Sequence, residues 1–193
     1  MKACQHTGLW AWSLQLLSTA AREKEARPDD LIYTYNYALS SLSRAGLWQH
    51  ALGLLAELLA NGQRPDSVSF SCVIDACSRK GVWLTALRIL DAMPRYGVQQ
   101  TTRSYNAAIA ACAEAGEWRA ALWQMSEMWD SCAVPDSFTF GHLVVACERS
   151  RQWQQALCLL QDARSHGVEV DLVMVSCAVS AACSEGLVVV VVV

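Results

Sequence analysis

The residue types that most often carry out chemistry are present in this chain, but their spacing argues against catalysis and metal binding. There are nine cysteines and four histidines. No Cys-x-x-Cys pair occurs, and Cys72 with Cys77 and Cys177 with Cys183 come closest to the spacing of a ligand pair. The histidines have no acid or nucleophile at a shared spacing, and the His-x-Glu signature of zinc deaminases is missing. We therefore expect no enzyme, no metal site and no cofactor.

The composition indicates a folded protein that does not bind nucleic acid by bulk positive charge. Hydrophobic residues make up 53% of the chain and charged residues 17%, which excludes a disordered class. The formal charge is −3, although a basic strip on one face is compatible with that total. No window reaches the roughly 18 apolar residues that span a bilayer, so we expect no membrane partner. The opening residues lack the apolar core of a signal peptide, which favours a reducing intracellular or organellar compartment.

A period of 35 residues runs through the chain. Tryptophans recur at this interval, and so do glycines, cysteines and Ala-Leu pairs, although Arg151 stands where the next glycine would be. We expect a partial repeat at 1–31, four repeats at 32–66, 67–101, 102–136 and 137–171, and a truncated repeat with a poly-valine end at 172–193. The columns are Trp48, Trp83, Trp118 and Trp153; Gly46, Gly81 and Gly116; Cys77, Cys112 and Cys147; and the pairs that begin at Ala51, Ala86, Ala121 and Ala156.

Each repeat carries two helical patterns. Tyr105, Ala108, Ile109 and Cys112 follow the i, i+3, i+4, i+7 spacing of one helix face, and residues 51–59 form a broad apolar stripe. The glycine column falls between the two patterns, where a helix ends in a left-handed turn. Pro-Asp pairs close two repeats, and Pro94 predicts an early end or a kink of its helix. Single repeats are too small to bury their apolar faces, so stacking must form one core.

This pattern resembles the pentatricopeptide repeat. The resemblance rests on the strings Tyr-Thr-Tyr-Asn at 33–36 with Arg-Pro-Asp at 64–66, and Arg-Ser-Tyr-Asn at 103–106 with Val-Pro-Asp at 134–136. It covers nearly the whole chain except the valine end. It implies an all-α fold, an α-solenoid wound as a right-handed superhelix, with the first helices lining a concave groove. It also implies sequence-selective binding of single-stranded RNA at about one base per repeat.

The family's base-reading residues are the fifth and the last residue of each repeat. An amide paired with a carboxylate is associated with uracil, which implies a uridine preference at two repeats, those of Asn36 and Asn106. The second residue of a repeat is expected to stack on the base, and an arginine column near the end of the first helix is expected to contact phosphate, with Glu114 interrupting it. The reading residues are Asn36 with Asp66, Ser71 with Thr101, Asn106 with Asp136, Gly141 with Asp171, and Ser176; the stacking residues are Tyr33, Val68, Arg103, Phe138 and Val173; the phosphate residues are Arg44, Arg79 and Arg149.

Several alternatives stay open. Asn36 and Asn106 could cap or bond to a neighbouring helix, and the tryptophans are expected to pack rather than stack on bases. A protein-binding scaffold of the tetratricopeptide type competes with RNA binding, although its repeat has 34 residues. The chain could also be a fragment of a longer array. Family resemblance implies a mitochondrial or chloroplast protein of RNA processing, stability or editing; the RNA target and the oligomeric state are not encoded in any motif.

Overall fold

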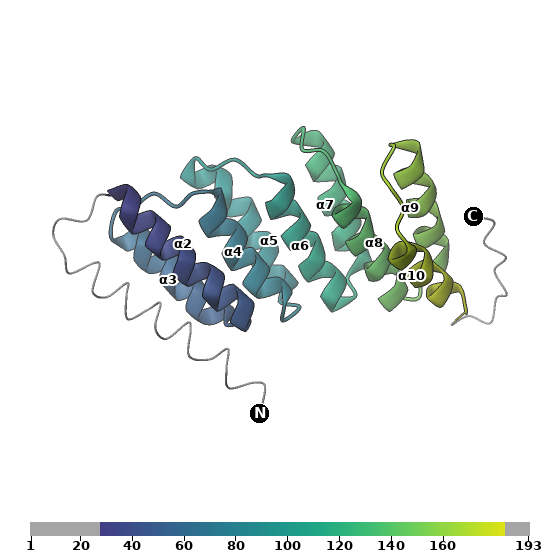
Figure 1. Cartoon of the computed structure of the whole chain (residues 1–193), viewed down its shortest axis with the longest axis horizontal. Coiled ribbons are helices and arrows are strands. Elements are labelled where there is room, and N and C mark those ends of the chain that lie inside the picture. Colours follow the sequence, from purple (N-terminus) through teal and green to yellow (C-terminus); the bar gives the residue numbers. More distant parts are fainter. Residues whose placement is uncertain (1–27, 184–193) are drawn as a thin grey trace, which may run out of the picture. The chain divides into compact units, whose positions relative to one another are not determined.

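The structure, a computed structural model, describes residues 28–183 of the 193-residue chain, and in that range it contains helices and no strands (Figure 1). This confirms the predicted all-α class. The nine α-helices and one 3-10 helix of this range are α2 (Pro28–Ala45), α3 (Trp48–Ala60), α4 (Ser67–Ser78), α5 (Trp83–Ala92), η1 (Met93–Tyr96), α6 (Thr102–Ala115), α7 (Trp118–Asp130), α8 (Ser137–Arg149), α9 (Trp153–Ser165) and α10 (Leu172–Cys183).

The helices alternate between a first and a second helix of each repeat. The four second helices, α3, α5, α7 and α9, all begin at a tryptophan of the 35-residue column. The first helices pack on their successors: α2 on α4 in one part of the chain, and α6 on α8 and α8 on α10 in another. Each second helix packs on the first helix of its own repeat. This arrangement is that of an all-α repeat solenoid.

The chain divides into two compact units, Met1–Gln100 and Thr101–Val193. In the first unit α2, α3, α4 and α5 form two antiparallel helical pairs, followed by η1. In the second unit α6 to α9 form two further pairs, and α10 packs against both α8 and α9. Each unit therefore contains at least one complete step from one repeat to the next.

A buried aromatic column recurs at the repeat interval. Tyr35, Phe70, Tyr105 and Phe140 are at most 2% exposed and belong to four successive first helices. The two tyrosine hydroxyls are not left unpaired: that of Tyr35 accepts from Asn61 Nδ2 at 3.1 Å, and that of Tyr105 lies 2.8 Å from Ser131 Oγ. A buried phenol needs such a partner because burial removes its water. Three of these first helices, α4, α6 and α8, also bury the cysteine column.

The turns within the hairpins follow the glycine column. Gly46, Gly81 and Gly116 have φ of 68°, 63° and 74°, the left-handed conformation that the sequence predicted. Arg151 occupies the equivalent position and also has a positive φ, 55°. The turn therefore keeps its geometry without glycine, at a local conformational cost.

Two helix boundaries bear on the sequence expectations. The second helix of the second repeat ends at Ala92, and η1 carries Pro94, which confirms the predicted early end. The helix α2 begins at Pro28, before the expected repeat start at residue 32. Proline is tolerated in the first turn of a helix because the missing N–H would have no intrahelical partner there.

Candidate functional site

In the first unit, the amide of Asn36 is bonded to the last residue of its own repeat and to one residue of the following repeat. Its Nδ2 donates to both carboxylate oxygens of Asp66, at 3.2 and 3.0 Å. Its Oδ1 accepts from the hydroxyl of Ser69 at 2.6 Å. Asn36 lies in the middle of α2, whereas Asp66 is the residue that precedes α4. The predicted pair is therefore brought together by the packing of one first helix on the next.

The second unit repeats this arrangement with different residues. Asn106 Nδ2 donates to Asp136 Oδ1 at 2.9 Å, and Asn106 Oδ1 accepts from Thr139 Oγ1 at 2.6 Å. Asn106 lies in α6, and Asp136 precedes α8. The same geometry has thus formed twice, in two separate units, from a serine in one case and a threonine in the other.

The aspartates have a second task, which explains their precise position. Asp66 and Asp136 are the N-caps of α4 and α8, and their Oδ1 atoms accept from the backbone N–H of Ser69 at 2.8 Å and of Thr139 at 2.9 Å. The hydroxyls complete a capping box by accepting from the aspartate N–H. In each unit, one carboxylate therefore both caps the helix and binds the amide.

The pKa of Asp136 lies below its ordinary value. Burial alone would raise it, because a charged carboxylate loses hydration. Hydrogen bonds from the Thr139 N–H, the Asn106 amide, the Thr139 hydroxyl and the Phe138 N–H outweigh that effect and stabilise the anion. The carboxylate is consequently charged at neutral pH and serves as an acceptor for the amide.

The remaining predicted reading residues make local bonds. Ser71 Oγ donates to the Ser67 carbonyl of its own helix at 2.7 Å, and Thr101 caps α6 by accepting from the Ser104 N–H. Gly141 offers no side chain, and Asp171 Oδ1 accepts from the Met174 N–H at 2.7 Å. Ser176 Oγ donates to the Val173 carbonyl at 2.8 Å. Two of the predicted pairs therefore form the amide–carboxylate contact.

The predicted stacking residues are all exposed. Tyr33 is 71% exposed, Val68 42%, Phe138 70% and Val173 62%, and Arg103 is exposed as well. Tyr33 and Arg103 precede the two asparagines by three residues, so they are neighbours on the same helix face. Flat or apolar side chains that are open to solvent beside a hydrogen-bonding amide are able to hold a planar ring.

The arginine column differs in its surroundings from one repeat to the next. Arg44 and Arg79 are exposed at the ends of α2 and α4. Arg149 instead pairs with Glu114: its guanidinium lies 3.0 Å from the carboxylate and donates to the Glu114 carbonyl at 2.9 Å. Glu114 therefore interrupts the arginine column and also forms an ion pair with Arg149, the arginine of the following repeat.

The tryptophans and cysteines serve packing. The four tryptophans of the column are partly buried at the starts of the second helices, as expected for packing residues. Burial raises the pKa of Cys77 and Cys147 to about 11. Burial and the charge of Glu117 raise that of Cys112 to about 12. These thiols stay protonated at neutral pH, which makes them poor nucleophiles and poor metal ligands.

Residues 28–183 contain neither a metal-binding cluster nor a membrane-spanning helix. No group of three or more His, Cys, Asp or Glu side chains in this part is arranged to hold a metal ion. None of its helices combines the length and the apolar character that crossing a membrane requires.

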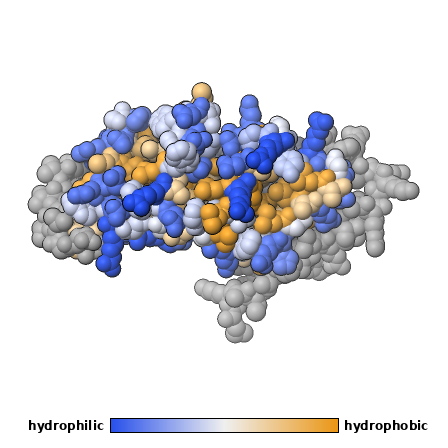
Figure 2. All heavy atoms as spheres, turned by 180° about the vertical axis from the view of Figure 1, so that it is seen from behind, coloured by the Kyte–Doolittle hydropathy of each residue, from blue (hydrophilic) through white to orange (hydrophobic). Residues whose placement is uncertain are grey.

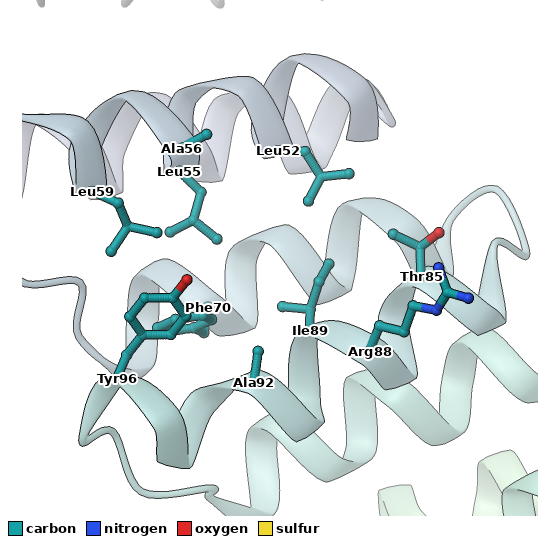
Figure 3. A pocket seen from close by; sticks show the side chains of 10 residues that line it. All are labelled: Leu52, Leu55, Ala56, Leu59, Phe70, Thr85, Arg88, Ile89, Ala92 and Tyr96. Carbon is teal, nitrogen blue, oxygen red and sulfur yellow. The ribbon is translucent and has the colours of Figure 1, made fainter.

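An apolar groove lies in the first unit, on other elements than the reading pair. Its volume is about 330 Å³, and side chains of α3 face those of α5 and η1 across it (Figure 3). Leu55 and Leu59 line one side, Ile89 and Tyr96 the other, and Phe70 reaches it from α4. Figure 2 shows apolar surface between polar side chains on the face turned away from the view of Figure 1.

Sequence reasoning missed three features of the site. Ser69 and Thr139 were not singled out, although a hydroxyl residue recurs at the third position of all four repeats as Thr34, Ser69, Ser104 and Thr139. Tyr37 is 71% exposed and lies next to Asn36. Its position outside the buried apolar stripe of α2 could have indicated an exposed ring near the site. Lys80 lies exposed next to Arg79, where the paired charges Arg79-Lys80 were visible in the sequence.

Comparisons with known proteins agree on one family. The sequence profile of the PPR repeat family matches residues 31–79, and that of the PPR repeat matches 68–98 and 103–132. No curated protein sequence gives a significant match.

Solved structures share the fold at low sequence identity. The PPR domain of Arabidopsis thaliana protein-only RNase P 1, solved in complex with tRNA, has 19% identity and a TM-score of 0.69, with 90% of each chain covered. The pentatricopeptide repeat protein PPR10 from maize has 22% identity and a TM-score of 0.65 over 88% of this chain. PPR10 in complex with an 18-nt psaJ RNA element has 24% identity and a TM-score of 0.72 over 96% of this chain. The chain spans about a quarter to a third of the PPR10 chains.

Proposed function

Because the chain belongs to the pentatricopeptide repeat family, we propose that it binds single-stranded RNA and reads about one base per repeat. The observation that carries the proposal is the amide–carboxylate pair, formed once in each unit by Asn36 with Asp66 and by Asn106 with Asp136. Solved relatives of similar fold were captured with RNA, namely PPR10 with an 18-nt psaJ RNA element and the RNase P domain with tRNA. Both supports point to RNA as the ligand class.

The proposed mechanism assigns one step to each kind of side chain. The second residue of a repeat stacks on the base, as Tyr33, Val68, Arg103, Phe138 and Val173 are exposed and able to do. The asparagine amide bonds to the base edge, since an amide both donates and accepts. The aspartate holds the amide, and Arg44 and Arg79 attract the phosphates. Uracil is the proposed base at the two asparagine repeats.

The remaining repeats have a weaker proposed role in reading. Ser71 with Thr101, Gly141 with Asp171, and Ser176 lack the amide and therefore contribute mainly through stacking and position. Stacking contributes on the order of 1–3 kcal/mol per base, and association itself costs several kcal/mol. Weak binding by this segment alone and stronger binding within a longer array are the expected behaviour.

The cellular role is proposed from the family. The chain acts as an RNA-binding module without catalysis of its own, in mitochondrial or chloroplast RNA processing, stability or editing. An alternative is a protein partner. Residues 101–193 favour it, since they carry ten Asp and Glu against five Lys and Arg, and an acidic surface attracts basic peptides more readily than RNA.

A stacking variant and a matched control test the proposal. Phe138→Ala removes an exposed ring from the first helix α8, and Trp123→Ala removes one, 64% exposed, from the second helix α7. Binding of a uridine-rich single strand is measured by fluorescence anisotropy. Phe138→Ala is expected to weaken it about tenfold, within the range of one stacked base, and Trp123→Ala to leave it unchanged. Equal losses, or no binding by the unchanged protein at any RNA concentration, would reject the proposal.

A further inference from the structure

The hydroxyls of Ser69 and Thr139 accompany both asparagine amides and have no assigned part in base reading. We propose that they are positioning residues that hold each amide in one of its two flipped orientations and thereby set the choice of uracil over cytosine. This inference rests on the proposed function. Its basis is a closed ring of three side chains (amide, carboxylate and hydroxyl), present once in each unit, rather than any single contact.

The direction of the hydroxyl proton follows from the bonds around it. Thr139 Oγ1 accepts from the Asp136 N–H at 3.0 Å, so one of its lone pairs is engaged. It lies 2.6 Å from Asn106 Oδ1 and 3.0 Å from Asp136 Oδ1. Two oxygens approach to 2.6 Å only when a proton lies between them, so the Thr139 hydroxyl donates its proton chiefly to the amide oxygen and more weakly to Asp136 Oδ1. The amide oxygen is then fixed toward Thr139.

The other half of the amide is fixed by the carboxylate. Asn106 Nδ2 donates to Asp136 Oδ1, and the charged carboxylate has acceptors only and no proton to donate. A flipped amide would set its oxygen against the carboxylate and lose the hydroxyl bond at the same time. Asn36 is likewise held between Ser69 Oγ and Asp66, where its Nδ2 donates to both carboxylate oxygens. In both units, then, the oxygen and nitrogen of the amide have defined places before any ligand binds.

A defined orientation matters because uracil and cytosine present opposite patterns. Uracil offers an O4 acceptor beside an N3–H donor, whereas cytosine offers an N4–H₂ donor beside an N3 acceptor. An amide that is free to flip is able to match either edge, and specificity then disappears. An amide held in one orientation matches one of them and opposes the other. Discrimination arises from this mismatch as much as from the favourable contact.

Another repeat of the same chain supplies an internal control. Ser104 occupies the same third position, and its hydroxyl bonds to the Thr101 N–H and carbonyl in the same capping turn. The fifth residue of the preceding repeat is Ser71, so no amide is present for it to orient. Loss of the Ser104 hydroxyl therefore removes the capping interaction without touching an amide. Any effect specific to the amide must be absent there.

The experiment compares Thr139→Val with Thr139→Ser and Ser104→Ala in the full chain. Thr139→Val keeps the shape and removes the hydroxyl, and Thr139→Ser keeps the hydroxyl. Affinities are measured for single strands that carry uracil or cytosine at each position in turn. Thr139→Val is expected to lower the uracil-to-cytosine ratio at one position by about three- to tenfold, the range covered by one neutral hydrogen bond. Thr139→Ser and Ser104→Ala are expected to keep the ratio.

A second measurement separates this inference from the proposed function. In the free protein, the side-chain NH₂ shifts of Asn106 are expected to differ from those of a free amide, and to move toward the free-amide values in Thr139→Val as the two orientations average. Unchanged NH₂ shifts in Thr139→Val, or a uracil preference equal to that of the unchanged protein, would overturn the orienting role while RNA binding stands. If the unchanged protein binds no RNA, the base-selection claim falls together with the proposed function. If Ser104→Ala lowered the uracil-to-cytosine ratio as much as Thr139→Val does, the Thr139 hydroxyl would act only as a helix cap.

Discussion

At the scale of single residues, one carboxylate caps the first helix of a repeat and holds an amide of the preceding first helix. Asp136 accepts from the Thr139 N–H at 2.9 Å and from Asn106 Nδ2 at 2.9 Å. Any change to it must therefore act on stability and on the proposed reading site together. Both the free energy of unfolding and the RNA affinity must be measured, because only then is an unstable variant distinguished from one that has lost base reading.

The pH dependence of stability tests the charge on Asp136. Its pKa is lowered in the folded protein from an ordinary 3.8, so its charge stabilises the fold at neutral pH, and that contribution is lost as the pH falls through the lowered value. Asp136→Ala is expected to cost about 1–2 kcal/mol at pH 7, as for other lost N-caps, and less near pH 3. Urea denaturation at the two pH values measures the difference. Asp130→Ala, which removes an exposed carboxylate from the end of α7, is the control and is expected to change stability little at either pH. A constant cost for Asp136→Ala across the two values would contradict the charged cap.

The residue scale also shows where sequence reasoning reaches its limit. The spacing of 30 residues between Asn36 and Asp66 is readable, and the resemblance named both residues. That their atoms lie within bonding distance depends on how α2 packs on α4, which no local pattern encodes. The hydroxyl of Ser69 has the same limit. Its capping box with Asp66 is readable from the local sequence, but its bond to Asn36 Oδ1 joins two repeats and is not.

At the scale of helices, one apolar stripe per helix determines which leucines matter. In α5, Leu90 is fully buried, whereas Leu84 is 55% exposed on the same helix. Leu90→Ala is expected to destabilise the fold by about 2–5 kcal/mol, because it removes buried methyl groups and leaves a cavity. Leu84→Ala is expected to change stability by less than about 1 kcal/mol. Urea denaturation of both variants gives the comparison, and similar costs would contradict the assigned orientation of α5.

The hairpin turns provide a pair of substitutions with opposite signs. Arg151 takes φ of 55° where the other repeats have glycine, and Gly116 takes 74°. Arg151→Gly is expected to stabilise the protein by up to about 1 kcal/mol, since the left-handed conformation strains a residue with a Cβ. Gly116→Ala is expected to destabilise it by a similar amount. A Cβ at Gly116 would meet its nearest neighbour at 3.8 Å, so the backbone and not a clash is the cause. Thermal denaturation of both variants tests the signs; a loss of stability in Arg151→Gly would mean that the arginine side chain outweighs the strain.

The element scale was the most predictable part of the chain. The tryptophan column marks the first residue of every second helix between α3 and α9, and the glycine column marks the turns before α3, α5 and α7. Both follow from local chemistry repeated at a fixed interval. The early start of α2 at Pro28 was not predicted, because the repeat boundary was set from the motif and a helix extends upstream wherever its first turn permits.

At the scale of the whole molecule, charge is distributed unevenly between the two units. Residues 1–100 carry ten Lys and Arg against eight Asp and Glu, and residues 101–193 carry five against ten. Phosphate attraction is therefore expected mainly from the first unit, which contains Arg44 and Arg79. In the second unit, the arginine at the equivalent place, Arg149, is paired with Glu114. The net charge of −3 thus conceals one basic unit and one acidic unit.

Releasing Arg149 tests whether this pair limits the proposed RNA binding. Glu114→Gln removes the carboxylate that lies 3.0 Å from the guanidinium, so that the arginine is able to contact a phosphate. The pair is about half exposed and contributes little to stability, so the variant is expected to fold normally. Affinity for a single strand is expected to rise a few-fold, and the slope of log affinity against log salt to steepen by about 0.7, the increment for one added phosphate contact. Glu169→Gln changes the net charge equally from an exposed position after α9 and serves as the control. A slope that steepens equally in both variants would show that total charge, and not the released arginine, governs binding.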